Sequence, residues 1–316
     1  MVGVGRRAGV GSEGAGVGLP RVLVLGGSCL SVLVHDHPVP GHDVPGGVHV
    51  HTTVGCMGPG KALNLQRLGF PTTLHTVVGD DQPGARVRDL LAGAGVPVVH
   101  DVDPAGTNTH VNLMDRNGAR RGIPIITPSR EPAVDLPRLE ASIAAADLIA
   151  LNPHGFCRQA IPAIRRHGKP VWADLGDFEL GNPYFDDFRA AADVVTMSGI
   201  HLPDQPSLLA DLIAEGKHLA VVTNGRNGSL ALDAAGELVH TEAVVDYPMV
   251  DTNGAGDSFH AGLLYGVATG RPVRQALQVA TIVAGLTVSS LDLVHPNLSP
   301  SLVEDELGRR FPAFAT

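Results

Sequence analysis

The residues with the clearest chemical potential lie in one short segment, from Asp251 to Asp257. The five residues between them, Thr-Asn-Gly-Ala-Gly, are small and are followed by a helical pattern. Glycine lets the backbone bend so that successive N–H groups point to one place, and a helix N-terminus adds the positive end of its dipole. The segment is therefore predicted to bind an anion such as a phosphate. Asp257 is then either an ordinary helix cap or a general base that takes a proton from an attacking hydroxyl.

The segment is part of a longer match, Asp-Thr-Asn-Gly-Ala-Gly-Asp-Ser-Phe-His-Ala-Gly, which starts at Asp251. It resembles the C-terminal motif of the ribokinase-like (PfkB) carbohydrate kinases, whose usual form is Asp-Thr-x-Gly-Ala-Gly-Asp. The resemblance implies a phosphotransferase that moves the γ-phosphate of ATP to a hydroxyl of a sugar, nucleoside or related small metabolite, with Mg²⁺. It also implies that the amides of Gly254, Ala255 and Gly256 stabilise the transferred phosphoryl group and that Asp257 deprotonates the acceptor. Positioning and electrostatic stabilisation are what phosphoryl transfer chiefly requires.

Two other segments strengthen the resemblance. Val78-Gly79-Asp80-Asp81, followed by Gly84, is similar to the family's Gly-x-Asp-x-x-Gly segment. The run from Thr223 to Gly228 is similar to the Thr-x-Gly-x-x-Gly turn near the nucleotide, although an ordinary strand-to-hairpin turn has the same composition. The nucleotide contacts implied by the resemblance are Thr223, Gly225, Gly228, Thr252 and Asn253.

The substrate positions depart from the family pattern. Ser31 stands where the first strand is usually followed by an Asp that holds sugar hydroxyls, so the position keeps a hydrogen-bonding group but no charge. Gly60 stands where an Asn usually binds substrate. The run Gly58-Pro59-Gly60-Lys61 can be interpreted as a new anion site for a substrate with a phosphate or carboxylate, or as a tight start of a helix with a solvated lysine. The implied substrate contacts are Ser31, Gly58, Gly60 and Lys61.

The metal positions depart as well. The family's Asn-x-x-Glu segment, which organises Mg²⁺, corresponds to Ser198-Gly199-Ile200-His201. Either ATP and water alone hold Mg²⁺, since this ion usually keeps several waters, or catalysis is weakened. Asp251 is a candidate ligand for a monovalent cation such as K⁺, with Asn253 beside it. The later loop of that site is replaced by Asp292-Leu293-Val294.

Apolar runs and helical spacing alternate along the chain after residue 20. This rhythm predicts an α/β fold, and the resemblance makes it a ribokinase-like three-layer α/β/α fold with a mostly parallel central sheet and a small β-sheet lid. Residues 1–20 are expected to be a flexible Gly-rich tail, 21–316 the kinase domain, and about 32–54 and 105–127 the inserted lid strands, with a hairpin at Asn117-Gly118. Strands are expected at Arg21–Gly27, His49–Val54, Thr73–Val78, Val96–Val99, Leu148–Leu151, Val171–Leu175, Val194–Met197 and Leu219–Thr223. Helices are expected at Lys61–Leu68, Gly84–Ala94, Leu136–Ala146, Gln159–His167, Ser207–Glu215, Ser258–Thr269 and Val273–Ser290.

Composition limits the partners. The net charge of −9 argues against a general affinity for nucleic acid, and no apolar run approaches the ~18 residues of a membrane span. Three widely spaced cysteines are typical of reduced thiols in the cytoplasm. The His-rich stretch at 35–51 is either a metal site or, as we prefer, a solvent-facing loop and hairpin. The resemblance also implies a homodimer formed through the lid.

Three classes of function remain open from sequence. The first is a small-molecule kinase. The second is a catalytically weak or inactive ligand-binding homologue of the same fold, which the missing Asn-x-x-Glu favours and the intact Asp257 opposes. The third, a dinucleotide-dependent oxidoreductase, has little support, because the strand ending in Gly26-Gly27 has no proper Gly-x-Gly-x-x-Gly.

Overall fold

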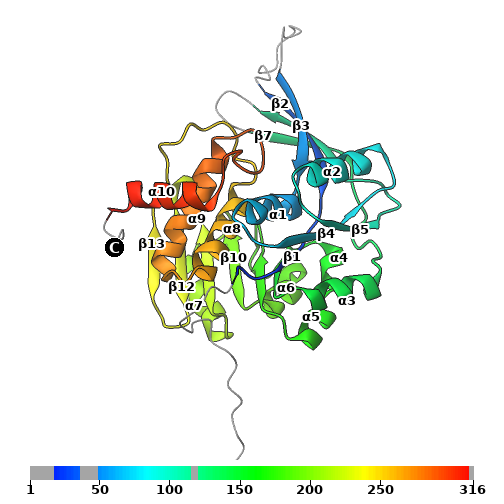
Figure 1. Ribbon diagram of the computed structural model, residues 1–316. Helices are drawn as coiled ribbons and strands as arrows, with labels where there is room; N and C mark the ends of the chain where they lie inside the picture. The colour runs from blue at the N-terminus through cyan, green and yellow to red at the C-terminus, as the bar shows by residue number, and fades with distance from the viewer. Residues whose placement is uncertain (1–17, 36–48, 115–119, 313–316) are drawn as a thin grey trace, which may run out of the picture.

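A computed structural model describes residues 18–35, 49–114 and 120–312 (Figure 1). Most of the expected tail, most of the His-rich stretch and the Asn117-Gly118 turn lie outside these residues. Within the described part of the chain, the strands form one sheet of nine strands and one of four. Figure 1 shows the small sheet at one end of the molecule, beyond the helices that cover the large sheet.

The large sheet is mostly parallel. Its strands are β1 (Val22–Leu25), β4 (Thr72–Val78), β5 (Val98–Val102), β8 (Leu148–Leu151), β9 (Val171–Asp174), β10 (Val194–Ser198), β11 (Leu219–Thr223), β12 (Ser229–Asp233) and β13 (Leu238–Thr241). They lie in the order β13-β12-β11-β10-β9-β8-β1-β4-β5, and only β12 and β13 pair antiparallel to their neighbours. The order runs outward from β1 in both directions, so the sheet has a topological switch point between β1 and β8.

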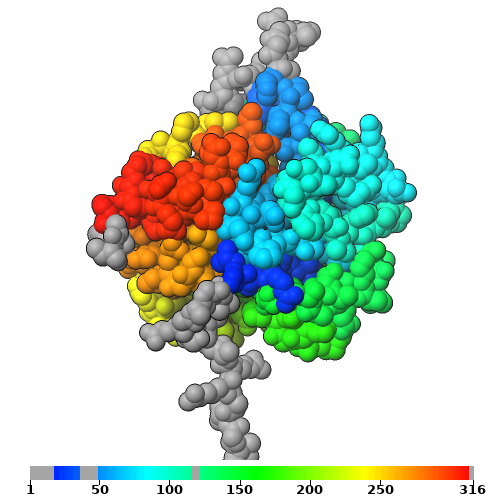
Figure 2. Space-filling view, viewed as in Figure 1, coloured from blue at the N-terminus to red at the C-terminus, as the bar shows by residue number. Residues whose placement is uncertain are grey.

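Helices cover both faces of this sheet. Successive strand residues point to opposite faces, as in β1, where Val22 and Val24 join one core cluster and Leu23 and Leu25 join the other. The first cluster packs under α1 (Met57–Arg67), α2 (Gln82–Gly93), α8 (Ala255–Ala268), α9 (Val273–Val288) and α10 (Pro300–Arg310). The second packs under α3 (Leu136–Ala145), α4 (Gly155–Arg158), α5 (Ile161–His167), α6 (Asp186–Ala191) and α7 (Gln205–Ala214). The predicted three-layer α/β/α fold is confirmed. In Figure 2, the blue segment that includes the exposed end of α1 lies between the cyan segment of α2 and the red α10, while most of α1 is buried beneath the surface.

The small sheet is the expected lid. Its strands are β2 (Cys29–His35), β3 (His49–Gly55), β6 (Thr109–Met114) and β7 (Arg120–Ile126), in the order β3-β2-β6-β7. β2 begins four residues after β1 ends, so the chain passes from the large sheet to the lid without a helix. The sequence did not separate this strand from the loop after β1.

Several predicted boundaries were wrong. α1 begins at Met57 and not at Lys61, so the expected turn Gly58–Lys61 is the first part of a helix. The glycines have a low helix propensity, so the sequence did not predict this first turn. Pro59 is tolerated there because an N–H in the first turn of a helix has no intrahelical acceptor. The helix expected at Gln159–His167 is α5, which begins at Ile161 with Pro162 in its first turn. The single turn of α4 precedes it and was not predicted. α6 and α10 were not predicted, although Ser299 caps α10 by accepting a hydrogen bond from the N–H of Leu302.

Two further expectations concern membrane-spanning helices and disulfide bonds. Among the described residues, no helix is both long and apolar enough to cross a membrane. Cys29, Cys56 and Cys157 are all described, and none forms a disulfide.

Candidate active site

A cavity lies at the switch point of the large sheet. Open α/β sheets bind ligands in the crevice at the carboxyl ends of their strands, where the strand order reverses. The cavity has a volume of about 620 Å³ and is lined by Ser28, just after β1, and by His154, just after β8. Asp103, Asn108 and Tyr184 are among its other polar lining residues. This position and lining are typical of a site for a polar small molecule.

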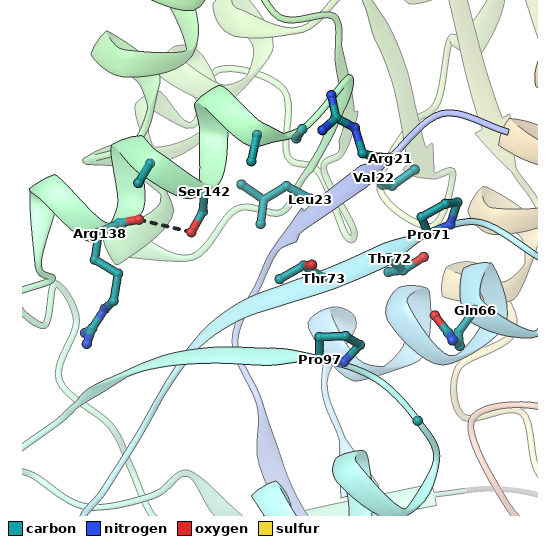
Figure 3. A pocket seen from close by; sticks show the side chains of 14 residues that line it. Arg21, Val22, Leu23, Gln66, Pro71, Thr72, Thr73, Pro97, Arg138 and Ser142 are labelled. Atoms are coloured by element: carbon teal, nitrogen blue, oxygen red, sulfur yellow. Dashed lines mark hydrogen bonds between the residues drawn. The ribbon is translucent and has the colours of Figure 1, made fainter. Parts of the chain in front are cut away.

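A second cavity of about 620 Å³ lies at the opposite ends of the strands (Figure 3). Val22 and Thr72, at the starts of β1 and β4, line it. Of its two arginines, Arg21 pairs with Asp147 and Arg138 pairs with Asp101. We therefore place the chemistry at the first cavity and not at this one.

At the same carboxyl edge of the large sheet, a lysine joins two carboxylates. The Nζ atom of Lys61 lies 2.5 Å from Oδ1 of Asp257 and 2.7 Å from Oδ2 of Asp174. Lys61 comes from α1, Asp174 from the carboxyl end of β9, and Asp257 from the first turn of α8. The Lys61 side chain is 0% exposed, so the prediction of a solvated lysine was wrong. With both carboxylates on Nζ, the lysine is also not a free cation for an anionic substrate.

Gly60 explains how Asp257 fits. A Cβ atom at residue 60 would lie 2.7 Å from Cγ of Asp257 and closer still to Oδ2. Such a contact is shorter than any that real Cβ atoms make, so the carboxylate would have to move. The glycine that replaces the family's Asn therefore leaves the space in which Asp257 lies.

The pKa values of the two carboxylates shift in opposite directions. Burial raises the pKa of Asp257 to about 6; Lys61 opposes this rise and the nearby Asp174 adds to it. Burial also acts to raise the pKa of Asp174, but the positive charge of Lys61 outweighs it and lowers that pKa. Asp257 is thus a buried carboxylate with a pKa near neutrality at the start of a helix, which is a property of general bases.

The start of α8 presents amides to the same place. Gly254, with φ 77°, is the residue before the helix, and Ala255 is its first residue. The first N–H groups of a helix have no intrahelical acceptor. A Cβ added at Gly256 would meet nothing within 4 Å, so the backbone there faces open space. The arrangement fits a phosphate held at a helix N-terminus.

The chain matches one protein family over most of its length. Residues 30–175 and 188–299 match the pfkB family carbohydrate kinase. The chain belongs to this family. It is 30% identical over 273 residues to the acarbose 7(IV)-phosphotransferase of Actinoplanes sp., covering 83% of this chain and 89% of that protein. It is 29% identical over 237 residues to the fructoselysine 6-kinase of Escherichia coli, covering 72% and 88%.

Solved structures agree with this assignment. The microbiome-derived acarbose kinase Mak1 has a TM-score of 0.83 and 25% identity, covering 93% of this chain and all of that chain. This pfkB-family carbohydrate kinase is therefore a phosphotransferase with an alcohol group as acceptor, and ATP and Mg²⁺ are its expected cofactors.

None of the four substrate contacts implied by the resemblance lines the cavity of the kinase. Gly60 and Lys61 contact Asp257, as described above. Gly58 is a packing residue: a Cβ atom there would lie 2.7 Å from the carbonyl oxygen of Gly26. Ser31 is 0% exposed, and its Oγ lies 2.8 Å from Nε2 of His110, so it joins two lid strands.

The turn that is predicted to contact the nucleotide lies at the carboxyl end of β11. Thr223 ends β11, and residues 225–227 form a single 3₁₀ turn. Gly225 and Gly228 have φ values of 55° and 83°, where glycine is favoured. A Cβ atom at Gly228 would strike the backbone of Thr241, so this glycine is also required by the hairpin itself.

The structure treats the predicted monovalent-cation ligand and the predicted Mg²⁺ positions differently. Asp251 is 2% exposed; its Oδ1 accepts the N–H of Asn253 at 2.8 Å, while its Oδ2 has no hydrogen-bond partner among the described residues. An unpaired buried carboxylate oxygen fits a cation ligand. For Mg²⁺, the described residues contain no group of three or more His, Cys, Asp or Glu side chains that could hold a metal.

Two acidic residues from other segments that the sequence singled out have structural roles. Asp292, from the altered later loop, accepts hydrogen bonds from Thr53 at 3.0 Å and lies 2.8 Å from Nε2 of His51, so it joins lid strand β3 to the loop after α9. Asp81 caps α2 through the N–H of Gly84 and accepts the N–H of Thr107, both at 2.8 Å.

Sequence reasoning missed Asp174 and His154. Both stand at the carboxyl ends of correctly predicted strands, Val171–Leu175 and Leu148–Leu151. In a parallel sheet these ends meet at one edge. A search for polar residues at the carboxyl ends of all predicted parallel strands would therefore have found both residues.

Proposed function

We propose that this carbohydrate kinase transfers the γ-phosphate of ATP to a sugar hydroxyl with Asp257 as the general base. Asp257 takes the proton of the acceptor hydroxyl, the hydroxyl oxygen attacks the γ-phosphorus, and ADP leaves. The amides of Gly254, Ala255 and Gly256 stabilise the charge on the transferred phosphoryl group. The observation that carries this proposal is the buried carboxylate of Asp257, which lies in the first turn of α8 and is held through Lys61 and Asp174 at the carboxyl edge of the large sheet.

The acceptor is proposed to be a carbohydrate larger than one ring. A volume of about 620 Å³ lies within the ~300–1,000 Å³ typical of pockets for drug-sized ligands. Two of the similar proteins are named as acarbose kinases, which supports an acarbose-like pseudo-oligosaccharide as the first acceptor to test.

The nucleotide is proposed to lie on the other side of Asp257. Its phosphates approach the start of α8, near Thr252 and Asn253, and its base lies toward Thr223, Gly225 and Gly228. When bound, Mg²⁺ neutralises phosphate charge; Ser198 and His201 replace the usual Asn and Glu, so water completes its coordination.

Asp251 is the proposed ligand of a monovalent cation. In wild-type enzyme, replacing Li⁺ by K⁺ at constant ionic strength is expected to raise the rate severalfold, because the unpaired buried oxygen gains a partner. In Asp251→Asn, which lacks the charge, this activation is expected to disappear. Equal rates in both salts for the wild type would remove the cation from the mechanism.

The exposed face of the lid is the proposed homodimer contact. Val50 on edge strand β3 is 53% exposed, and Ile123 and Ile125 on the opposite edge strand β7 are 39% and 60% exposed. Exposed apolar surface of this kind is used at interaction sites. Ile125→Lys is expected to convert a dimer into a monomer in sedimentation velocity. A wild-type protein that sediments as a monomer at every concentration would exclude this contact.

The proposed activity is tested by ATP-to-ADP conversion with a panel of acceptors headed by acarbose, followed by detection of the phosphorylated product. A catalytically inactive ligand-binding homologue would give acceptor-induced thermal stabilisation but no ADP above the acceptor-free control.

A further inference from the structure

The role of Lys61 is not explained by the proposed chemistry. A lysine that is 0% exposed is costly to bury unless it is paired. Its two carboxylate partners come from different elements, Asp174 from β9 and Asp257 from α8. The contact therefore ties α1, the sheet and the catalytic helix together at one atom.

Gly60 and Lys61, which are neighbours in α1, contact the carboxylate of Asp257 on its two sides. Nζ of Lys61 lies 2.5 Å from Oδ1, and Oδ2 occupies the space that a Cβ atom at residue 60 would fill. We propose that Lys61 is a positioning residue that holds the carboxylate of Asp257 toward the acceptor, and that Asp174 is the second carboxylate that shares the lysine. This inference rests on the proposed role of Asp257 as the base.

The charges explain why two carboxylates are needed. If Lys61 paired with Asp257 alone, proton transfer to Asp257 would leave a buried ammonium without a partner, and the carboxylate would be a poor base. With Asp174 present, protonation of Asp257 leaves Lys61 and Asp174 as an ion pair whose net charge is zero. Asp174 thus keeps Asp257 basic, while Lys61 keeps it ionised often enough to act.

Three titratable groups around the Lys61–Asp257 contact, namely His154, His260 and Cys56, are neutral near pH 7. Burial lowers the pKa of His154 to about 4 and that of His260 to about 3, and the charge of Lys61 adds to both shifts. A hydrogen bond with Cys29, together with burial, raises the pKa of the Cys56 thiol. Burial acts to raise the pKa of the Cys29 thiol, but hydrogen bonds with Cys56 and His110 outweigh it and lower that pKa to about 6. The charged groups that shift the pKa of Asp257 itself are Lys61 and Asp174.

The test is the pH dependence of kcat/KM, which reports groups of the free enzyme. The base must be ionised, so activity falls as the pH drops below the pKa of Asp257. Lys61→Met removes the positive charge and is expected to move this acidic limb upward by about 1–3 pH units. Asp174→Asn removes the like charge and is expected to move it downward by about 1 unit.

Opposite shifts from two substitutions in one contact would not arise from a merely structural role. Lys217→Met is the matched control: Lys217 is also buried, at 5% exposure, but its Nζ caps the carbonyl oxygens of Arg189 and Ala192. It is expected to lower thermal stability and leave the acidic limb in place. Circular dichroism and thermal unfolding establish that each variant is folded.

The outcomes separate this inference from the proposed function. Unchanged limbs, or shifts in the same direction, in folded Lys61→Met and Asp174→Asn overturn the positioning role, provided that Asp257→Asn is inactive. If Lys61→Met does not fold, Asp174→Asn decides alone: a downward shift supports the inference and an unchanged limb overturns it. An active Asp257→Asn would instead overturn the proposed base.

Discussion

Asp257→Asn is expected to lower kcat by about 10²–10⁴-fold, the usual contribution of a positioned general base. Asn has nearly the same shape as Asp and can still accept a hydrogen bond from Lys61, but it cannot take a proton at neutral pH. The binding of ATP and acceptor should change little, because the cavity and the amides of α8 remain. Single-turnover kinetics with matched thermal unfolding would measure this.

The control for this substitution is Asp211→Asn, which makes the same chemical change on the exposed surface of α7. It is expected to retain wild-type kinetics. A kcat for Asp257→Asn within a few fold of that control would mean that another group accepts the proton.

Gly60→Ala is expected to lower kcat by about 10²-fold, because a displacement of ~1 Å at a reacting group costs about that much. The new Cβ would lie 2.7 Å from Cγ of Asp257, so the carboxylate must move away from its position beside Lys61. The free energy of unfolding should also fall by about 1–3 kcal/mol, as in other overpacked sites. Steady-state kinetics and chemical denaturation would measure the two effects.

Gly93→Ala provides the same change without the contact. Gly93 ends α2, and a Cβ atom there meets nothing within 4 Å. This variant is expected to keep both activity and stability. If Gly60→Ala behaved like Gly93→Ala, the close approach of α1 to Asp257 would have no catalytic importance.

The parts of the fold that the sequence predicted well are those with strong local patterns. β8 and β11 were placed within a residue because buried parallel strands are short, continuous apolar runs. The start of α1 was missed because its glycines serve tertiary contacts: Gly58 packs on Gly26, and Gly60 packs on Asp257. Local propensity carries no information about such contacts.

In the candidate site, too, the local features could be predicted from the sequence and the tertiary contacts could not. The segment from Gly254 to Asp257 is contiguous, so its loop, helix start and carboxylate could be interpreted together. The pairing of Lys61 with Asp174 and Asp257 joins residues from three elements, and no spacing in the sequence predicts it. For this reason Lys61 was placed as a substrate contact, whereas its Nζ binds two carboxylates inside the protein.

The most direct test of the central claim is the ATP-dependent phosphorylation of a carbohydrate by wild-type enzyme and Asp257→Asn in parallel. ADP release and the mass of the acceptor would be followed together. We expect acceptor-dependent ADP release, an acceptor heavier by one phosphoryl group, and loss of both in Asp257→Asn. ADP release that does not depend on any carbohydrate, or equal product from both enzymes, would contradict a sugar kinase that uses Asp257 as its base.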